Sequence, residues 1–483
     1  MASSVNPAVT EAVERAAAAG ARWRATPAEE RAQVLEAVAD VLLKHADELW
    51  PVAHAETHLG EVRLRGEIAR TASQFRLFAD VIRDGGHVEA VIDHSDPGAT
   101  PPRPDVRRMY HPIGVVAVFS ASNFPFAFSV AGGDTVSALA AGCPVVVKAH
   151  EGHPETSDLT ASVVRQALPD PGLLGLVHGF EAGAPLVQHP LVTAVGFTGS
   201  LAGGKAIQGL IDERPDPIPF YGELGSVNPV VVLPSADPSA VASGFAASLT
   251  LGVGQFCTNP GLVFVPDGFE EPIRDAVAAT SGGLMLTAKI RDGYLRSVGR
   301  LAGRAESGGG LSVLATGSAP VDSPEAGAGA VTPQVFTAEL EVFADGLPEL
   351  GEECFGPAAI IVKYRDPSDL PAVLRRLPGS LTATIHSTDP REAHDLAPVL
   401  ERIAGRLIWN GWPTGVAVCW AMHHGGPWPA TTNAAHTSVG AASIKRWLTP
   451  VAYQDWPVEL LPPEVRDDNP LGVPQRVDGR LRV

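Results

Sequence analysis

The sequence predicts an α/β protein built on parallel sheets, and three observations support this fold class. Short apolar strands alternate with helical segments along most of the chain, which is typical of βαβ units. The 50 glycines and 43 prolines suit the tight joints that such units need. A chain of 483 residues, at roughly 150 residues per domain, is expected to form about three domains.

The first 90 residues are expected to be helical. A Thr-Pro-Ala-Glu sequence at residues 26–29 has the pattern of a capping box, with proline at the first helical position. Apolar residues recur at helical spacing behind it, and a second helical pattern runs from Glu61 to Arg83. The proline-rich segment 94–112 is expected to be irregular.

From Gly114 the pattern changes to short apolar runs separated by helical segments. Strands are expected at residues 114–119, 143–148, 194–199 and 228–234, with helices over 131–142 and 153–168. A second α/β run extends from residue 235 to residue 443. The tail beyond Leu448 is rich in proline and aspartate and shows little periodicity.

Charge and cysteine usage narrow the class of protein. The net charge of −18 argues against nucleic acid or an anionic membrane as a partner. Residues 113–133 are uncharged, but Pro125 and two adjacent glycines favour a buried strand and turn over a membrane span. The four cysteines are widely spaced without a CxxC pair, and the first residues lack a signal-peptide pattern. A reducing compartment, the cytoplasm, is therefore expected.

Three residues in turn-rich segments are candidates for catalysis. Cys257 lies among glycines and a proline, where a thiol can be presented to a cleft as a nucleophile. Glu223 stands between two glycines and can act as a general base, and the Asn123 amide can donate to a developing oxyanion. Each has an ordinary alternative, respectively an inert buried cysteine, a surface acid and a turn-forming asparagine.

A glycine-rich loop at residues 196–204 is a candidate for phosphate binding. It follows a predicted strand and precedes a helical pattern that begins at Lys205, and N–H groups at such a helix start favour anions. Neither the GxGxxG nor the Walker A pattern is present, so the loop alone is a weak signal. Lys148 closes a strand at the sheet edge where α/β proteins bind ligands.

No metal site is expected from the sequence. The histidine pairs at residues 150/153 and 423/424 show neither an HExxH arrangement nor a partner cluster. A hydrolase nucleophile elbow is also absent, because Ser200 does not lie in a GxSxG sequence.

Taken together, seven segments resemble the aldehyde dehydrogenase superfamily. They follow the family's order along nearly the whole chain: SNFPF, VVVKAHE, GFTGSLAGG, ELGSVNP, GQFCTNPG, EECFGP and WNGWPTG. Within the superfamily, SNFPFAFSVAGGDT, GELGSVNPVV, PTGVAVCWAMHHGGPWPATT and the tail LPPEVRDDNP look most like the 2-oxoglutarate semialdehyde (2,5-dioxopentanoate) dehydrogenases. The resemblance implies two Rossmann-like parallel-sheet domains and a small oligomerisation module. It also implies NAD(P)-dependent, hydrolytic oxidation of an aldehyde, with 2-oxoglutarate semialdehyde as the best-matched substrate.

The resemblance assigns a role to each candidate. Cys257 would attack the aldehyde and form a thiohemiacetal and, after hydride transfer, a thioester. Asn123 and the backbone N–H of Cys257 would hold the oxyanion, and Glu223 would activate the water that releases the acid. The matching cofactor-binding residues are Lys148, Glu151, Gly199, Ser200, Gly204, Leu224, Glu353 and Phe355. The matching walls of the aldehyde tunnel are Phe124, Phe128 and Phe256.

Two positions depart from the family's pattern. Phe256, which precedes the nucleophile, narrows the tunnel and indicates a short substrate. Glu151 would face the adenosine 2′ group, where a carboxylate accepts a hydrogen bond from a hydroxyl but repels a phosphate. Many relatives in the subgroup are NADP-linked and differ here, so the sequence favours NAD over NADP and leaves the use of both open.

Three alternatives to this function stay open. The substrate could be another ω-semialdehyde or a medium-chain fatty aldehyde. The thioester could pass to coenzyme A, although Glu223 argues against that branch, or the chain could be a non-catalytic binding protein, although the intact candidates argue against it. An anionic semialdehyde calls for an arginine near the tunnel mouth, and the sequence does not place one.

Three unequal parts are expected. They are a dinucleotide-binding domain of residues 1–93 and 113–225, a catalytic domain of residues 226–440, and an oligomerisation module of residues 94–112 and 441–483. The module is too small to bury a core alone, which favours pairing with another subunit. The family forms dimers or tetramers, so a homodimer or a homotetramer is expected.

Overall fold

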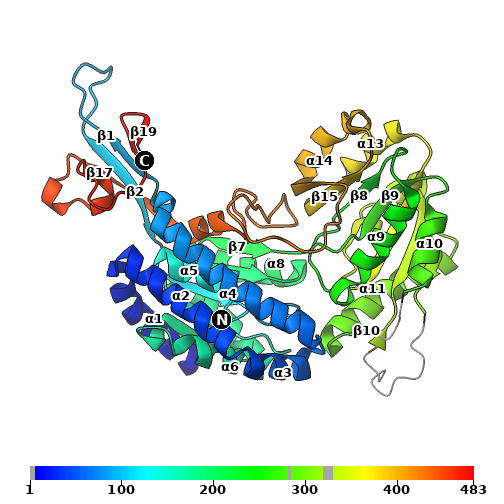
Figure 1. The fold of residues 1–483 in the computed structure, drawn as a ribbon, viewed down its shortest axis with the longest axis horizontal. Coiled ribbons are helices and arrows are strands. Elements are labelled where there is room, and N and C mark those ends of the chain that lie inside the picture. The colour runs from blue at the N-terminus through cyan, green and yellow to red at the C-terminus, as the bar shows by residue number, and fades with distance from the viewer. Residues whose placement is uncertain (1–5, 281–283, 319–329, 483) are drawn as a thin grey trace.

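The structure is a computed structural model that describes residues 6–280, 284–318 and 330–482. Its ribbon shows two large lobes, each built around a sheet of largely parallel strands, and a small sheet that projects from the N-terminal lobe (Figure 1). The α/β class predicted from the sequence is therefore confirmed.

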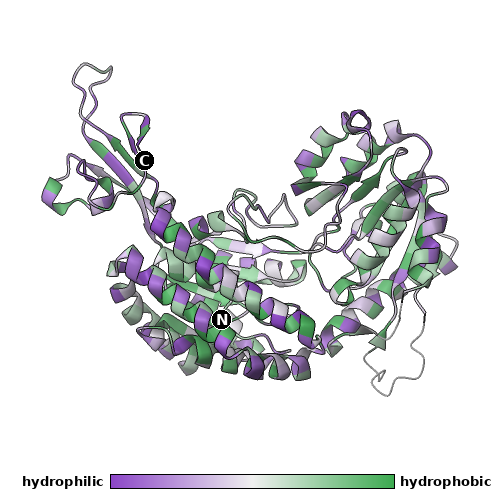
Figure 2. Cartoon of the chain, in the orientation of Figure 1, coloured by the Kyte–Doolittle hydropathy of each residue, from purple (hydrophilic) through white to green (hydrophobic). Residues whose placement is uncertain are grey.

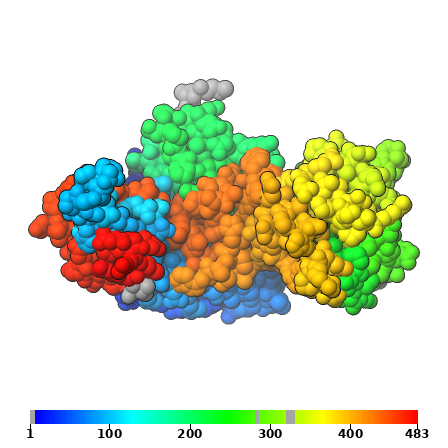
Figure 3. Space-filling model, turned by 90° about the horizontal axis from the view of Figure 1, so that it is seen from above, coloured from blue at the N-terminus to red at the C-terminus, as the bar shows by residue number. Residues whose placement is uncertain are grey.

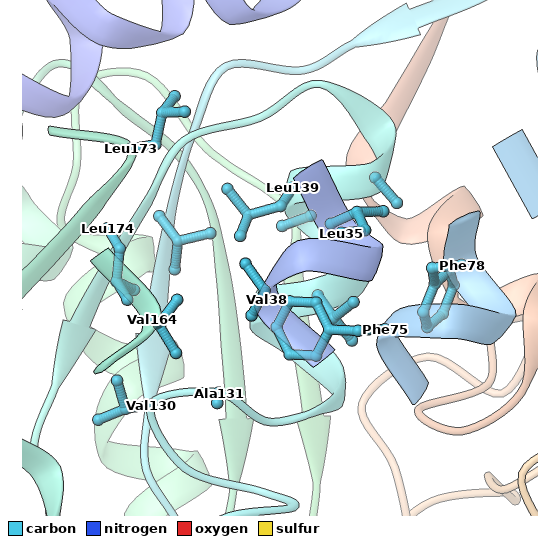
Figure 4. Packing of buried hydrophobic residues seen from close by; sticks show 14 of the residues in the cluster. Leu35, Val38, Phe75, Phe78, Val130, Ala131, Leu139, Val164, Leu173 and Leu174 are labelled. Carbon is cyan, nitrogen blue, oxygen red and sulfur yellow. The ribbon is translucent and has the colours of Figure 1, made fainter. Parts of the chain in front are cut away.

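The N-terminal lobe begins with four helices, as the apolar spacing predicts. They are α1 (Pro7–Ala25), α2 (Ala28–Lys44), α3 (Ala46–Thr57) and α4 (Glu61–Asp84). The capping box predicted at residues 26–29 is wrong, because the Thr26 hydroxyl donates to the Arg22 carbonyl of α1 and no side chain caps α2. Apolar residues of α2 and α4 pack together in the main core of this lobe, where Figure 4 labels Leu35, Val38, Phe75 and Phe78.

Five parallel strands form the first sheet, in the order β5-β4-β3-β6-β7. They are β3 (Val115–Phe119), β4 (Val145–Lys148), β5 (Leu174–Val177), β6 (Val192–Thr198) and β7 (Phe220–Glu223). The helices between them are α5 (Gly133–Ala141), α6 (Pro154–Arg165), α7 (Gly183–Gln188) and α8 (Leu201–Asp212). α8 begins before the predicted Lys205, because the Ser200 hydroxyl caps it by accepting from the Gly203 N–H.

The second lobe holds a seven-stranded sheet in the order β11-β13-β14-β9-β8-β15-β16, in which only β11 is antiparallel to its neighbour. The strands are β8 (Val230–Val232), β9 (Leu262–Pro266), β11 (Ser312–Thr316), β13 (Gln334–Glu339), β14 (Ala358–Tyr364), β15 (Ser380–His386) and β16 (Ala404–Trp409). Its helices are α9 (Pro238–Thr250), α10 (Glu270–Ala278), α11 (Ala288–Glu306), α12 (Leu340–Asp345), α13 (Leu370–Leu374) and α14 (Ala397–Ile403). A separate pair is formed by β10 (Leu284–Met285) and β12 (Ala330–Val331).

The small sheet combines two segments that lie far apart in the sequence. Its order is β17-β2-β1-β18-β19, with β1 (Ala90–Asp93), β2 (Val106–Pro112), β17 (Leu448–Gln454), β18 (Gln475–Val477) and β19 (Arg480–Arg482). The prediction that segment 94–112 and the tail are irregular is wrong in part, because β2 and β17 pair with each other, with Pro112 opposite Leu448. Both strands contain a proline and lack a continuous apolar run, so neither gives a local strand signal.

Short 3-10 helices connect many of these elements. They are η1 (Gly86–Val88), η2 (Pro171–Leu173), η3 (Phe180–Ala182), η4 (Leu251–Gly254), η5 (Glu349–Gly351), η6 (Pro367–Asp369), η7 (Pro390–Ala393), η8 (Ala441–Trp447), η9 (Val458–Leu460) and η10 (Pro463–Val465). The strands of both large sheets are hydrophobic, whereas hydrophilic residues lie on the outer helix faces (Figure 2). Within the described residues, none of the helices has the length and apolarity that crossing a membrane requires.

Candidate active site

The three predicted catalytic residues lie around one cavity of about 320 Å³. Asn123 is in the turn that follows β3, and Glu223 is the last residue of β7. Cys257 is in the loop between η4 and β9, so it comes from the second lobe. The cavity therefore lies where the carboxyl end of the first sheet meets the second lobe, the edge at which α/β sheets bind ligands.

The loop that carries Cys257 is fixed by side-chain hydrogen bonds to its backbone. The Asn228 amide donates to the carbonyls of Cys257 and Asn259 at 2.8 and 2.9 Å. The Asn123 amide donates to the Gln255 carbonyl at 2.8 Å, which holds the proposed oxyanion donor beside the nucleophile loop. Gly254 has φ +68°, and a Cβ there would lie 2.5 Å from the neighbouring backbone of Pro357. A glycine is therefore required at the bend.

Glu223 and Cys257 share a third neighbour, His424. The His424 Nε2 atom lies 3.1 Å from Glu223 Oε1 and 3.5 Å from Cys257 Sγ. The Ser438 hydroxyl donates to the other Glu223 oxygen. Both partners belong to the segment between β16 and η8, which crosses the surface between the two lobes (Figure 3). Glu223 and His424 are buried, with 3% and 0% of their surface exposed.

This arrangement shifts the pKa values of the two predicted catalytic groups, Cys257 and Glu223, in opposite directions. Burial and the nearby Glu223 carboxylate raise the pKa of Cys257 well above that of an ordinary thiol. Burial also acts to raise the pKa of Glu223, but the His424 ring and the hydrogen bonds from His424, Ser438 and Cys257 outweigh it and lower that pKa. At neutral pH the resting site thus holds a neutral thiol and a carboxylate.

His424, which is not among the residues predicted from the sequence, lies near the predicted nucleophile Cys257. The statement that the pair at residues 423/424 has no partner cluster is wrong for His424, because Glu223 and Cys257 are its neighbours. The three ligand atoms lie within 4.8 Å of one another and are of types that zinc accepts. The expectation that no metal is bound stays a prediction. The partners of His424 come from distant segments of the chain, so no local signal in the sequence could have identified this histidine.

A larger cavity of about 950 Å³ adjoins the first. Lys148, Glu151, Gly199 and Ser200 line it, and Gly199 and Ser200 line both cavities. The N-terminus of α8, capped by Ser200, opens on this space and suits an anionic group. The Lys148 ammonium pairs with the Glu151 carboxylate at the cavity wall. Lys289, which the sequence analysis does not single out, also lines both cavities.

Three further predicted cofactor residues line the cavity with Cys257: Leu224, Glu353 and Phe355. Burial raises the pKa of Glu353 to about 8. Gly204 does not line either cavity, but a Cβ there would lie 2.4 Å from the Leu224 side chain, so the glycine makes room for that residue.

The predicted tunnel residues divide into two groups. Phe124 and Phe128 line the cavity that contains Cys257. Phe256 does not; it packs edge-on against Phe124, with ring centroids 5.3 Å apart, and lines a smaller cavity. Phe256 therefore contacts Phe124, a residue of the cavity wall, without lining the cavity that contains Cys257.

Comparisons with known proteins agree with one another. A family model described as the aldehyde dehydrogenase family matches residues 1–427. Alpha-ketoglutaric semialdehyde dehydrogenase 2 of Azospirillum brasilense is 49% identical over 491 residues, which cover 98% of this chain and 91% of the relative. The alpha-ketoglutaric semialdehyde dehydrogenase of Acinetobacter baylyi is 42% identical, covering 98% of this chain and 91% of the relative. A solved structure of PnpE in complex with nicotinamide adenine dinucleotide has a TM-score of 0.79 and 24% identity, covering 95% of this chain and 92% of that one.

Proposed function

Because the chain belongs to the aldehyde dehydrogenase family, we propose that it oxidises 2-oxoglutarate semialdehyde to 2-oxoglutarate with NAD or NADP as the electron acceptor. The observation that carries this is the meeting of Cys257, Glu223 and Asn123 at one cavity beside a larger cavity for the dinucleotide. The test measures 2-oxoglutarate and reduced cofactor together, without coenzyme A. Equal amounts of both are expected, whereas a requirement for coenzyme A would indicate the acylating reaction.

The first half of the reaction uses Cys257 as a nucleophile. In the resting site the Nε2–H of His424 faces the Glu223 carboxylate at 3.1 Å, and Nδ1 has no partner within the described residues. We propose that the ring proton first moves to Nδ1, which gives up that hydrogen bond, and that Nε2, 3.5 Å from Sγ, then accepts the thiol proton. The resulting imidazolium is paired with the Glu223 carboxylate. The thiolate attacks the aldehyde carbon, and the oxyanion that forms is held by the Asn123 amide and the Cys257 N–H.

The second half uses Glu223 as a base. A dinucleotide, when bound, would supply the hydride acceptor, and loss of the hydride from the thiohemiacetal carbon would leave a thioester on Cys257. Glu223 stays ionised because its pKa is lowered, so it can take a proton from water and direct the hydroxide to the thioester carbon. The C–S bond then breaks, and Cys257 leaves as a thiolate that recovers a proton.

The residues around the larger cavity fit a dinucleotide. The N–H groups at the start of α8 would face the pyrophosphate, Lys148 and Glu151 the adenosine ribose, and Glu353 the nicotinamide ribose. Gly204 allows Leu224 to approach α8 closely, which supports a place for Leu224 beside the nicotinamide end, together with Phe355.

Glu151 is expected to favour NAD, because its carboxylate repels a 2′-phosphate. The change Glu151→Gln should raise the ratio of kcat/KM with NADP to kcat/KM with NAD by about tenfold, which corresponds to roughly 1.4 kcal/mol. Glu155→Gln, an exposed residue of α6 outside the cavity lining, is the matched control and should leave the ratio unchanged. A wild-type enzyme that prefers NADP at least tenfold would contradict the preference.

Asn123→Ala is expected to lower kcat/KM by about 10²–10³-fold, because one oxyanion donor is lost. The lost hydrogen bond to Gln255 should cost only about 1 kcal/mol of unfolding free energy, so the variant stays folded. Asn123→Asp, similar in size but anionic, should be impaired at least as much. If kcat/KM of Asn123→Ala falls by less than about threefold, Asn123 does not hold the oxyanion.

The division of the chain and its assembly are part of the proposal. The first sheet, the second sheet and the small sheet support a dinucleotide-binding domain, a catalytic domain and an oligomerisation module with the boundaries given above. A homodimer or homotetramer is proposed, and light scattering that finds a monomer would reject the oligomerisation module.

Four cysteines without disulfides support a cytoplasmic location.

A further inference from the structure

One face of α4 presents two arginines to the aromatic wall of the active site. The Arg63 guanidinium carbon lies 4.4 Å from the Phe124 ring centroid and 4.7 Å from that of Phe256. The Arg70 guanidinium carbon lies 5.8 and 5.6 Å from the Phe124 and Phe128 centroids. Residues 63 and 70 are two helical turns apart, so both side chains leave α4 on the same side.

These arginines also approach the nucleophile loop. Arg63 Nη2 donates to the Asn123 carbonyl at 3.3 Å, and a Cβ on Gly252 would lie 2.6 Å from Arg63 Nη1. Burial lowers the pKa of the Arg70 guanidinium, and the carboxylates of Glu67 and Glu223 counteract this. Arg63 is thus next to the turn of Asn123, and both cations lie against rings that line the cavity, although neither arginine is itself in its lining.

The hydrogen-bonding capacity of these arginines is largely unused. Arg70 Nε, Arg70 Nη2 and Arg63 Nη1 are buried and have no hydrogen-bond partner within the described residues. Unpaired buried donors cost free energy, and charged ones cost more, so such groups in a native protein call for a partner. A carboxylate matches the planar fork of a guanidinium in shape and charge.

The local charge balance leaves one cation without a carboxylate. Glu67 lies between the two arginines on α4, and its Oε2 is 3.6 Å from Arg63 Nε. Its Oε1 is already used by the N–H groups of Phe126 and Ala127, at 2.8 and 2.9 Å. Glu67 is thus shared between the two arginines, and within the described residues Arg70 makes no ion pair of its own.

We propose that Arg70, with Arg63 beside it, forms the subsite that binds the carboxylate of an ω-aldehyde acid while Cys257 attacks its other end. This assignment rests on the proposed function, because it names the anion-binding end of the same active site. It supplies the arginine that the sequence does not place. It also predicts that the site selects by charge, so that chain length alone does not make a good substrate.

The test compares two aldehydes that differ in one group, 5-oxopentanoate and pentanal. For the wild type, kcat/KM is expected to be at least tenfold higher with 5-oxopentanoate. Arg70→Met should lower kcat/KM for 5-oxopentanoate and for 2,5-dioxopentanoate by between about tenfold and a hundredfold, mainly through KM, because a hydrogen-bonded charge partner is lost. The value for pentanal should stay the same or rise, and Arg70→Lys should recover part of the loss.

Arg76→Met is the matched control on the same helix. Arg76 is exposed and pairs with Asp40 at 2.7 Å, so its removal should change neither substrate's kcat/KM. A fall in Arg70→Met that is equal for both aldehydes, or no fall for the anion, would overturn the subsite and leave the proposed function intact. Wild-type preference for pentanal would overturn it without any variant, should Arg70→Met fail to fold. Absence of oxidation of every aldehyde by the wild type would reject the proposed function itself.

Discussion

Cys257→Ala should lower the rate of aldehyde oxidation by at least about 10⁴-fold, because the proposed mechanism has no route around the covalent intermediate. The nucleophile loop keeps its hydrogen bonds from Asn228, which go to carbonyl oxygens and do not involve the sulfur. The variant is therefore expected to fold and to bind the dinucleotide, which fluorescence titration can check. The measurement is cofactor reduction at saturating aldehyde.

Cys419→Ala is the matched control for this prediction. Cys419 is an exposed cysteine of the segment between β16 and η8, so its replacement leaves no buried cavity, and full activity is expected. Alkylation by iodoacetamide gives a second measurement. Because the pKa of Cys257 is raised, its thiolate fraction grows as the pH rises, and the alkylation rate should still be increasing above pH 9. Cys257→Ala that retains more than about a tenth of the activity would disprove covalent catalysis.

The sequence predicts those parts of the fold that have a local signal. The apolar runs predict the ends of β3, β4 and β8 to within about two residues. The helical pattern from Glu61 to Arg83 coincides with α4. The sequence does not predict β2 or β17, because each of these proline-containing strands is stabilised by the other, far away in the chain. Residues 26–29 match the capping-box pattern, but the Thr26 hydroxyl donates to the Arg22 carbonyl of the preceding helix and so does not cap α2.

The candidate site divides in the same way. Asn123, Glu223 and Cys257 are each marked by the turn around them, and the family resemblance joins them before the structure does. No turn or motif in the sequence singles out His424 or Arg70. An adjacent pair of histidines and an arginine on an amphipathic helix are common on protein surfaces, and only tertiary contacts show His424 buried against Glu223 and Arg70 against Phe124 and Phe128.

Glu223→Gln should separate the two halves of the reaction. The amide keeps the size of the side chain but cannot take a proton from water, so thioester hydrolysis should slow and steady-state turnover should fall by about 10²–10⁴-fold. The thioester forms before that step, and rapid mixing should therefore show a burst of about one reduced cofactor per active site. Denatured samples taken after the burst should carry the acyl group on Cys257.

The pKa of the Cys257 thiol provides a second test of the role of Glu223. Removing the Glu223 charge removes a cause of the raised pKa of Cys257, so iodoacetamide should label Glu223→Gln faster than the wild type at pH 8, although turnover is slower. His424→Gln should behave in the opposite way, with a slow burst and no accumulated thioester, because the group that accepts the thiol proton is lost. If Glu223→Gln instead loses the burst, Glu223 acts on the thiol and not on water, and the two residues exchange their roles.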